Sequence, residues 1–423
     1  MTSHIHRLIV LTTAAMLGGC AAAPPYPAAP PLAPALVDGG QSNMEDHADA
    51  QLKLKGDTQL NVLVLSGGGP YGAWGAGVLN GWNEGGNVPG VGTIPKWDVV
   101  TGVSTGALQS TAALLGDYKL MAKFYTDVNT SDIVTTNFFG SQVLAVVFCS
   151  SIYDSSPLRR LLVQVINDSV IDQVADQAAA GRKLYVGTVN LVDGRLYIWD
   201  MTWLALKARA SQSKVLYNRY RDIILASTSV PAIFPGVTID NAPHFDGGTR
   251  AQLFFQQRFL KELVKQKSNI TSLHQQLKLN GGIRPEAATT SPSESEEKSF
   301  VAGLSADEIK KIADAPKPKV YVIVNGYLGV LPASTANSAI PLALRGVDIL
   351  EDAARTSDVF AIKETSGLDF KYICEPADAP PLNDAEFDGK QMTKVYNLGV
   401  YYGKSGIWKT WVDSSEVFAN PVR

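Results

Sequence analysis

The sequence predicts an α/β fold, in which buried strands alternate with helices. Two segments carry this prediction: Leu60–Gly77, LNVLVLSGGGPYGAWGAG, and Trp97–Leu108, WDVVTGVSTGAL. In each, a short apolar run ends abruptly in glycines and then passes into a helical pattern. The composition agrees, because 45% of the 423 residues are hydrophobic and 18% are charged, which is enough to build a sizeable core. The length is compatible with one large domain or with two.

Strand and helix patterns alternate from the start of the globular region. Asn61–Leu65 and Asp98–Val103 are short apolar runs that predict buried strands. A helix is expected after each of them, at Pro70–Asn83 and from Ser104 to about Leu115.

The middle of the chain contains a predicted helix and a predicted hairpin. Ser155-Ser156-Pro157 provides an N-cap and a first-turn proline for a helix through Ile166. Lys183–Asn190 and Arg195–Asp200 flank Val192-Asp193-Gly194, a turn sequence typical of hairpins. Further along, we expect a helix at Asn218–Ala226, a proline-broken segment at Thr228–Pro235, a strand at Lys319–Val324, an amphipathic helix at Ile340–Ile362, and strands at Phe370–Cys374 and Lys394–Tyr402.

The first residues have the pattern of an export signal. Arg7 is the only charged side chain before the apolar stretch Leu8–Leu17, and Cys20 follows two small residues. This arrangement resembles the lipobox of bacterial lipoproteins, which implies a signal peptide at residues 1–19, cleavage before Cys20 and lipidation of its thiol. An ordinary secretory peptide with an incidental cysteine is the alternative. Ala21, rather than aspartate, after the cysteine suggests an outer-membrane location in the bacterial cell envelope.

Composition divides the mature chain into a tether and a folded domain. We expect a lipidated tether at residues 20–57 and one folded domain at residues 58–423. Ala21–Pro34 is almost entirely Ala and Pro, which favours an extended spacer with nothing to bury. Gly281–Glu297 is rich in Ser, Thr, Pro and Glu, which predicts a flexible insertion around residues 281–299.

The net charge argues against nucleic-acid binding, and the hydropathy argues against a membrane-spanning segment inside this domain. The formal net charge is −3, so the chain lacks the basic footprint of a nucleic-acid-binding protein. No internal run reaches the roughly 18 to 20 apolar residues that span a bilayer. Two cysteines remain after Cys20: Cys149 follows an apolar run and is expected to be a buried thiol, and the sequence leaves its pairing with Cys374 open.

The two glycine-rich segments predict the machinery of acyl transfer. Gly102-Val103-Ser104-Thr105-Gly106 has the form G-x-S-x-G, which places a serine on a sharp turn between a strand and a helix. The backbone N–H of Thr105 then faces a reacting carbonyl. Gly67-Gly68-Gly69 offers further N–H groups at a helix N-terminus, which suits an oxyanion. We therefore expect Ser104 to be a nucleophile beside an oxyanion hole.

A serine nucleophile needs a general base, and the positions of the five histidines limit which of them could serve. The signal peptide, the tether and the insertion region account for the other four histidines, so His244 alone is placed to serve a Ser-His-Asp triad. Asp246 follows two residues later, before two glycines. Burial in an apolar site raises the pKa of an aspartate and makes it a better base. From the residues alone, either His244 or Asp246 could be the base.

Three ordered motifs resemble the patatin-like phospholipases and lipid acyl hydrolases. They are Ser66-Gly67-Gly68-Gly69, Gly102–Gly106 and Asp246-Gly247-Gly248, and the similarity covers roughly Leu60 to Arg250. Flanking stretches are similar as well: YDSSPLRRLL at Tyr153–Leu162, VGTVNLVDGRLYIWD at Val186–Asp200 and ASTSVPAIFPGV at Ala226–Val237.

The resemblance implies a three-layer α/β/α fold around a mixed, mostly parallel sheet. It also implies hydrolysis of lipid acyl esters by a dyad of Ser104 and Asp246 without histidine. Gly67, Gly68 and Gly69 would form the oxyanion loop, and neither a metal nor a cofactor is required.

The chain departs from that family pattern in the glycine loop. Many members carry Arg or Lys two residues after the glycine triplet, where this chain has Tyr71. A cation at that place would assist an oxyanion or a phosphate, so its absence weakens a preference for charged head groups. Arg159 and Arg160 are candidates for a lipid phosphate, with a solvated helix face as the alternative. Tyr71 and Trp74 are candidates for an acyl pocket or for core packing.

Two other classes of protein compete with this interpretation. Gly67-x-Gly69-x-x-Gly72 after a strand fits a dinucleotide fingerprint, but Asp98 opens the next strand instead of closing it. A non-catalytic envelope lipoprotein is the second alternative, and the presence of Ser104 and Asp246 disfavours it. The sequence therefore predicts a membrane-anchored serine acyl hydrolase of the phospholipase A or lysophospholipase type, acting on lipids.

Overall fold

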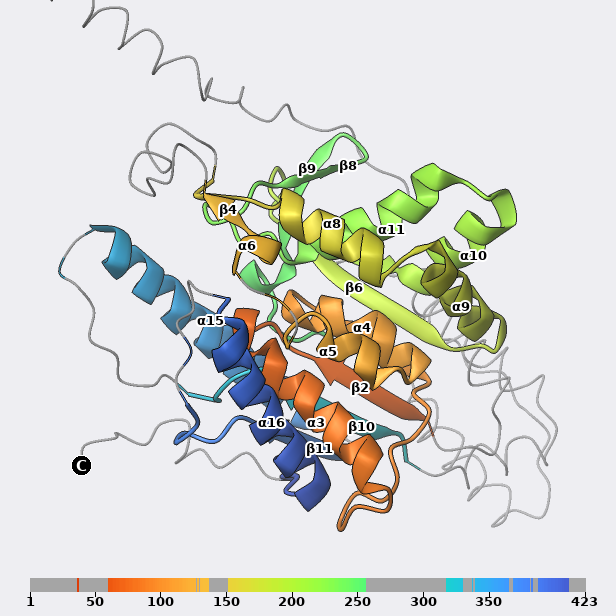
Figure 1. Ribbon diagram of the computed structural model, residues 1–423, viewed down its shortest axis with the longest axis vertical. Coiled ribbons are helices and arrows are strands. Elements are labelled where there is room, and N and C mark those ends of the chain that lie inside the picture. Colours follow the sequence, from red (N-terminus) through yellow and green to blue (C-terminus); the bar gives the residue numbers. More distant parts are fainter. Residues whose placement is uncertain are drawn as a thin grey trace, which may run out of the picture.

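The computed structural model describes residues 36–37, 60–126, 128, 130–136, 151–255, 317–329, 337, 339–364, 368–380, 382 and 387–410. These residues form one curved sheet with helices on both faces (Figure 1). Strand residues alternate between the two faces: Leu63 and Leu65 belong to one core, and Val62 and Val64 belong to the other. The predicted three-layer α/β/α fold is confirmed.

Five neighbouring strands of the sheet are parallel. In order they are β6 (Lys183–Asn190), β3 (Val99–Gly102), β2 (Asn61–Leu65), β10 (Lys319–Val324) and β11 (Asp369–Cys374). The antiparallel strands are β7 (Leu196–Asp200) beside β6, β1 (Leu36–Val37) beside β7, β9 (Ala242–Asp246), which also pairs with β6, and β8 (Val237–Ile239) beside β9. The sheet is therefore mixed and mostly parallel, as predicted.

Most helices cover one face of the sheet, where the larger core lies. They are α3 (Gly72–Gly85), α4 (Thr105–Leu115), α5 (Tyr118–Ala122), α8 (Ser156–Val165), α9 (Asp168–Ala179), α10 (Met201–Ser211), α11 (Lys214–Ser227) and α16 (Gly389–Ser405). The other face packs against α15 (Ala339–Lys363), which buries Val359 and Ile362. The remaining short elements are the 3₁₀ turns Gly69–Tyr71 and Gly247–Thr249, α6 (Thr130–Ile133), and the strand pair β4 (Thr135–Thr136) and β5 (Tyr153–Asp154).

One predicted strand is wrong: Lys394–Tyr402 lies inside the helix α16. Its valines and tyrosines favour a strand locally, but the buried residues follow a helical period. Asp388 caps the first turn by accepting from two backbone N–H groups. Gly399 and Gly403 then let α16 approach α3 at backbone contact, since a Cβ on Gly399 would lie 2.3 Å from the Trp74 carbonyl oxygen. α3 and α16 lie side by side in Figure 1.

Other boundaries shift by a few residues. The helix predicted at Pro70–Asn83 begins as the 3₁₀ turn and continues as α3, and α11 begins at Lys214, earlier than expected. Ser155 stands at the N-cap of α8, but its side chain does not cap the helix. Asp154 instead accepts from the N–H of Ser156, at 3.1 Å.

Several predictions fall on residues that the structure does not describe. The signal peptide, Cys20, the insertion around residues 281–299 and Cys149 lie outside the described residues, and so does the tether apart from the two residues of β1. Cys374 is partly buried. Among the described residues, no helix combines the length and the apolar content needed to cross a membrane.

Candidate active site

Ser104 lies on the turn between β3 and α4, in a strained backbone conformation. Its φ of 54° and ψ of −125° are rare for a residue with a side chain, and such strain is typical of a nucleophile held at the end of a strand. The flanking glycines are required sterically. A Cβ on Gly102 would lie 2.4 Å from the Gly106 carbonyl oxygen, and one on Gly106 would lie 2.4 Å from the Leu65 carbonyl oxygen. The G-x-S-x-G motif therefore has its predicted geometry.

A hydrogen-bond chain from α11 holds this turn in place. The N–H of Ser104 donates to Ser227 Oγ at 3.0 Å, and Ser227 Oγ donates to the Gly187 carbonyl oxygen at 2.7 Å. Ser227 is fully buried at the C-terminal end of α11. Sequence reasoning singled out the stretch that contains Ser227 but assigned it no role.

The register of the sheet brings Asp246 to Ser104. β3 ends at Gly102, which pairs with Val186 of β6. Beyond that point β9 takes the place of β3 beside β6, and Asp246 pairs with Thr188. The end of β9 therefore meets the turn after β3, and Ser104 lies close enough to Asp246 to lower the pKa of its carboxyl group.

The electrostatics of Asp246 are those of a desolvated carboxyl group. Burial raises the pKa of Asp246 to about 8, against hydrogen bonds from Ser104 and the Gly248 N–H, and Glu351 adds to the rise. The Gly248 bond is 2.7 Å long. The carboxylate is thus a much stronger base than an aspartate in water.

His244 contacts side chains of β6 and β7. Its Nδ1 lies 2.9 Å from Thr188 Oγ1, and its ring packs edge-on against Tyr197 and Trp199. Its Nε2 is buried without a partner. Burial lowers the pKa of His244 to about 4, so the imidazole is neutral at physiological pH. Of the two candidate bases, Asp246 interacts with Ser104, which lowers its pKa. The contacts of the His244 ring are instead with Thr188, Tyr197 and Trp199.

The glycine loop lies directly beside Ser104. A Cβ on Gly67 would lie 3.4 Å from the Cβ of Ser104. Gly68 and Gly69 have φ angles of 146° and 52°, which glycine adopts without cost. The Gly67 N–H donates to the Gln252 carbonyl oxygen at 3.0 Å.

Three backbone N–H groups remain for an oxyanion. The N–H groups of Gly68 and Gly69 have no acceptor within the described part of the chain. Thr105 is the first residue of α4, so its N–H has no acceptor inside the helix. The fourth predicted oxyanion residue, Gly67, already donates its N–H to the Gln252 carbonyl oxygen, so this N–H is not available to an oxyanion.

A fully buried polar cluster fixes the loop, and sequence reasoning missed it. The Asn325 N–H donates to Ser66 Oγ at 2.7 Å, and Asn325 Nδ2 donates to the Ser66 carbonyl oxygen at 2.7 Å. Gln109 of α4 donates to the Gly72 carbonyl oxygen at 2.6 Å and to Asn325 Oδ1 at 3.1 Å. The only sequence signal for Asn325 is its place at the end of β10, the sheet edge where active sites of α/β proteins form.

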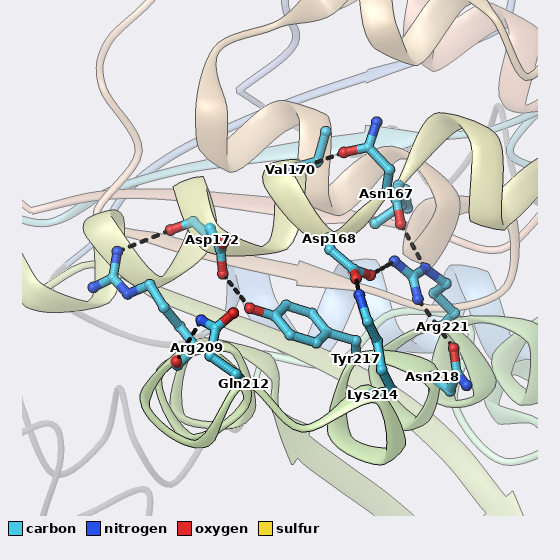
Figure 2. A network of polar contacts seen from close by, with 11 residues as sticks. Asn167, Asp168, Val170, Asp172, Arg209, Gln212, Lys214, Tyr217, Asn218 and Arg221 are labelled. Atoms are coloured by element: carbon cyan, nitrogen blue, oxygen red, sulfur yellow. Dashed lines mark hydrogen bonds and ion pairs between the residues drawn. The ribbon is translucent and has the colours of Figure 1, made fainter.

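A second polar cluster lies away from this site, on α9 and α11 (Figure 2). It borders a shallow surface pocket lined by Val163, Asn167, Asp168, Ser169, Lys214, Asn218 and Arg221. Arg221 donates to the Ile166 carbonyl oxygen, to Asn218 and to Asp168, and Lys214 also donates to Asp168. Each guanidinium nitrogen is thus engaged, which indicates a cluster that ties helices together. Within the described ranges, no group of three His, Cys, Asp or Glu side chains is placed to hold a metal ion.

Comparison with known proteins assigns the family of this region. Residues 63–257 match the family model described as patatin-like phospholipase, so the chain contains a patatin-like phospholipase domain. Among solved structures, VipD from Legionella pneumophila matches with 12% identity and a TM-score of 0.29. That match covers 71% of this chain and 66% of VipD, just under two thirds of its length. No curated protein matches the chain.

Proposed function

We propose that the protein is a serine acyl hydrolase of lipid esters, of the phospholipase A or lysophospholipase type, that works through a dyad of Ser104 and Asp246. The family of residues 63–257, which is one of lipid acyl hydrolases, supports the reaction class. The observation that supports the dyad is that Ser104, on its strained turn, lies beside the buried Asp246 carboxyl group and lowers its pKa.

The first half of the reaction transfers the acyl group to Ser104. Asp246 takes the hydroxyl proton as Ser104 Oγ attacks the ester carbonyl carbon. The carbonyl oxygen becomes an oxyanion, which the N–H groups of Gly68, Gly69 and Thr105 stabilise. Asp246 then gives its proton to the leaving alcohol oxygen, and an acyl ester on Ser104 remains.

The second half releases the fatty acid. Asp246 takes a proton from a water molecule as the water attacks the acyl carbonyl carbon through the same oxyanion hole. The Ser104 Oγ–carbon bond then breaks, and the proton on Asp246 returns to Ser104. No additional group is needed to balance the protons.

Labelling by a fluorophosphonate probe tests the nucleophile. The purified protein should label at Ser104, Ser104→Ala should not label, and a panel of phospholipids, lysophospholipids and glycerides should show ester cleavage by the unchanged chain. Absence of both labelling and cleavage in the folded protein would favour a non-catalytic binding role for the same fold.

We further propose that residues 1–19 are a signal peptide and that lipidation of Cys20 anchors the protein in the bacterial envelope, at the outer membrane. The lipobox-like pattern around Cys20 supports this location. An anchor of this kind would hold the hydrolase at a lipid surface, where its substrates are.

A further inference from the structure

Arg355 of α15 is a mostly buried guanidinium with few partners. Its side chain is 12% exposed, and its Nε is buried without any hydrogen-bond partner. Its two polar contacts both use Nη1, at 3.3 Å from the Tyr327 carbonyl oxygen and 3.9 Å from Asp352 Oδ1. Asp352 meanwhile accepts from the Gly329 N–H at 3.0 Å. Asp348 also interacts with Arg355 electrostatically. Neither carboxylate provides an acceptor to Nε, and a buried donor without an acceptor is costly, which points to a ligand that completes the guanidinium.

Arg221 shows the hydrogen bonds of a buried arginine with a structural role. Its side chain is 6% exposed, less than that of Arg355, and its guanidinium donates through Nε, Nη1 and Nη2 to three different acceptors (Figure 2). In Arg355 only Nη1 makes polar contacts, so Nη2 and Nε have no acceptor among the described residues.

The position of Arg355 connects it with the glycine loop. A Cβ on Gly326 would lie 3.7 Å from Arg355 Nη1 and 3.8 Å from the Cβ of Tyr71. Since Gly326 has no side chain, it places no atom between the Arg355 guanidinium and Tyr71. Gly326 also follows Asn325, whose carbonyl oxygen would lie 2.0 Å from a Cβ on Gly68. Arg355 therefore lies against the segment that carries the oxyanion donors.

The same part of α15 also lies close to the dyad. Glu351, one helical turn before Arg355, contributes to the raised pKa of Asp246. This stretch of α15 thus borders the active site from outside the segment matched by the family model, residues 63–257.

We propose that Arg355 binds the phosphate of the substrate head group at the edge of the active site. The proposal rests on the hydrolase function above and assigns one residue of this chain to the recognition of the lipid phosphate. Arg355 brings a cation from a distant part of the chain to the neighbourhood of Tyr71, which follows the glycine loop. A guanidinium suits this task because it keeps its charge and pairs two donors with two phosphate oxygens.

The test compares two substrates that differ in the phosphate. Phosphatidylcholine and diacylglycerol with the same acyl chains are presented in the same neutral detergent micelles, and kcat/KM is measured for each. Arg355→Gln should lower the ratio of phosphatidylcholine to diacylglycerol kcat/KM by about tenfold or more, the scale of a hydrogen bond to a charged group. Arg355→Lys should recover part of the ratio, because it keeps the charge but not the paired donors.

A control variant and a second measurement distinguish a loss of phosphate binding from a general effect on folding. Arg209 of α10 is 34% exposed and pairs with Asp176 of α9, so Arg209→Gln should leave the ratio unchanged. Inorganic phosphate should inhibit diacylglycerol hydrolysis competitively in the unchanged protein, and less so in Arg355→Gln.

Three outcomes would overturn the proposal or its basis. Equal loss on both substrates would show that Arg355 is structural, and an unchanged ratio in both Arg355 variants would show that the phosphate does not meet it. If the unchanged protein neither labels at Ser104 nor cleaves either lipid, the hydrolase function itself fails.

Discussion

At the scale of single residues, the site depends on what burial does to two neighbouring titratable groups. Asp246 and His244 are two residues apart on β9, and both are buried. Burial disfavours charge in each case, so it raises the pKa of Asp246 to about 8 and lowers the pKa of His244 to about 4. Burial therefore makes the Asp246 carboxylate the stronger base of the two, as the proposed dyad requires, and keeps the His244 imidazole neutral.

Substitution of each residue distinguishes a dyad from a triad. Asp246→Asn keeps the shape and removes the base, so hydrolysis should fall by about 100-fold or more, the scale of general-base catalysis. His244→Phe should keep most activity, since an aromatic ring replaces one packed between Tyr197 and Trp199. Ester-cleavage rates of the folded variants decide the matter. An inactive, folded His244→Phe with an active Asp246→Asn would establish a triad instead.

The pH dependence follows from the protonation of Asp246. Only the carboxylate accepts a proton, so kcat/KM should rise with pH and level off above about 8. An imidazole base with an ordinary pKa would instead give a limb near pH 6.5. A pH–rate profile on a neutral ester measures this directly, and a profile that is already flat above pH 6 would contradict the raised pKa.

The raised pKa of Asp246 should also make the stability of the folded protein depend on pH, and here a rise in pH is unfavourable. The pKa of Asp246 is raised in the folded state, so the neutral form stabilises the fold at low pH. That contribution is lost as pH rises from the unfolded value, about 3.9, toward about 8. Asp246→Asn cannot ionise, so its melting temperature should fall less between pH 5 and pH 9 than that of the unchanged protein.

At the scale of elements, two features act through close backbone approach: the glycine loop held by β10, and the pairing of α3 with α16. Both put small residues where any side chain would collide with a neighbouring carbonyl oxygen. In the loop this closeness positions oxyanion donors, and in the helix pair it packs the core.

Asn325 should affect turnover through the loop. Asn325→Asp keeps the shape but cannot donate to the Ser66 carbonyl oxygen, so the oxyanion donors shift. We expect kcat to fall by about 10- to 100-fold, the cost of a small misplacement, with little change in KM. Kinetics together with a thermal melt measure this. A stable variant with normal kcat would show that the loop holds its position without Asn325.

Alanine substitution of two helical glycines tests the helix pair. Gly399→Ala should destabilise the fold by about 1–3 kcal/mol through overpacking against the Trp74 carbonyl oxygen. Gly346→Ala in α15 is the matched control, since a Cβ there meets nothing within 4 Å, and it should stabilise by about 0.5–1 kcal/mol. Denaturant unfolding gives both values. Similar stability for the two variants would contradict the close packing.

At the scale of the whole molecule, the fold places the active site at one edge of the sheet. β2, β3 and β10 run parallel, so the loops after their C-terminal ends meet there, and α15 borders the same edge. Attachment of the chain to a membrane through Cys20 would bring this edge to its lipid substrate.

Cys20→Ser tests the location of the molecule. The variant should lose lipidation and either leave the membrane fraction or accumulate as a precursor. Fractionation of cells with immunodetection measures this, and a mature variant that still sediments with membranes would show that another feature holds the protein there.

Local motifs made part of the site predictable from sequence. Ser104, the glycine triplet and Asp246 each follow a strand, and their glycines are needed for steric reasons that act within a few residues. The parallel strands and the hairpin of β6 and β7 were also predictable, because apolar runs and a turn sequence specify them locally.

Only the tertiary structure decided the rest. Ser227, Asn325 and Arg355 act through contacts with residues far away in the chain, which no local pattern encodes. α16 is a helix because Gly399 and Gly403 pack on α3, against the strand preference of its own residues. The choice of Asp246 over His244 as the partner of Ser104 likewise depended on sheet register, since the pairing of β9 with β6 sets which side chain meets the turn after β3.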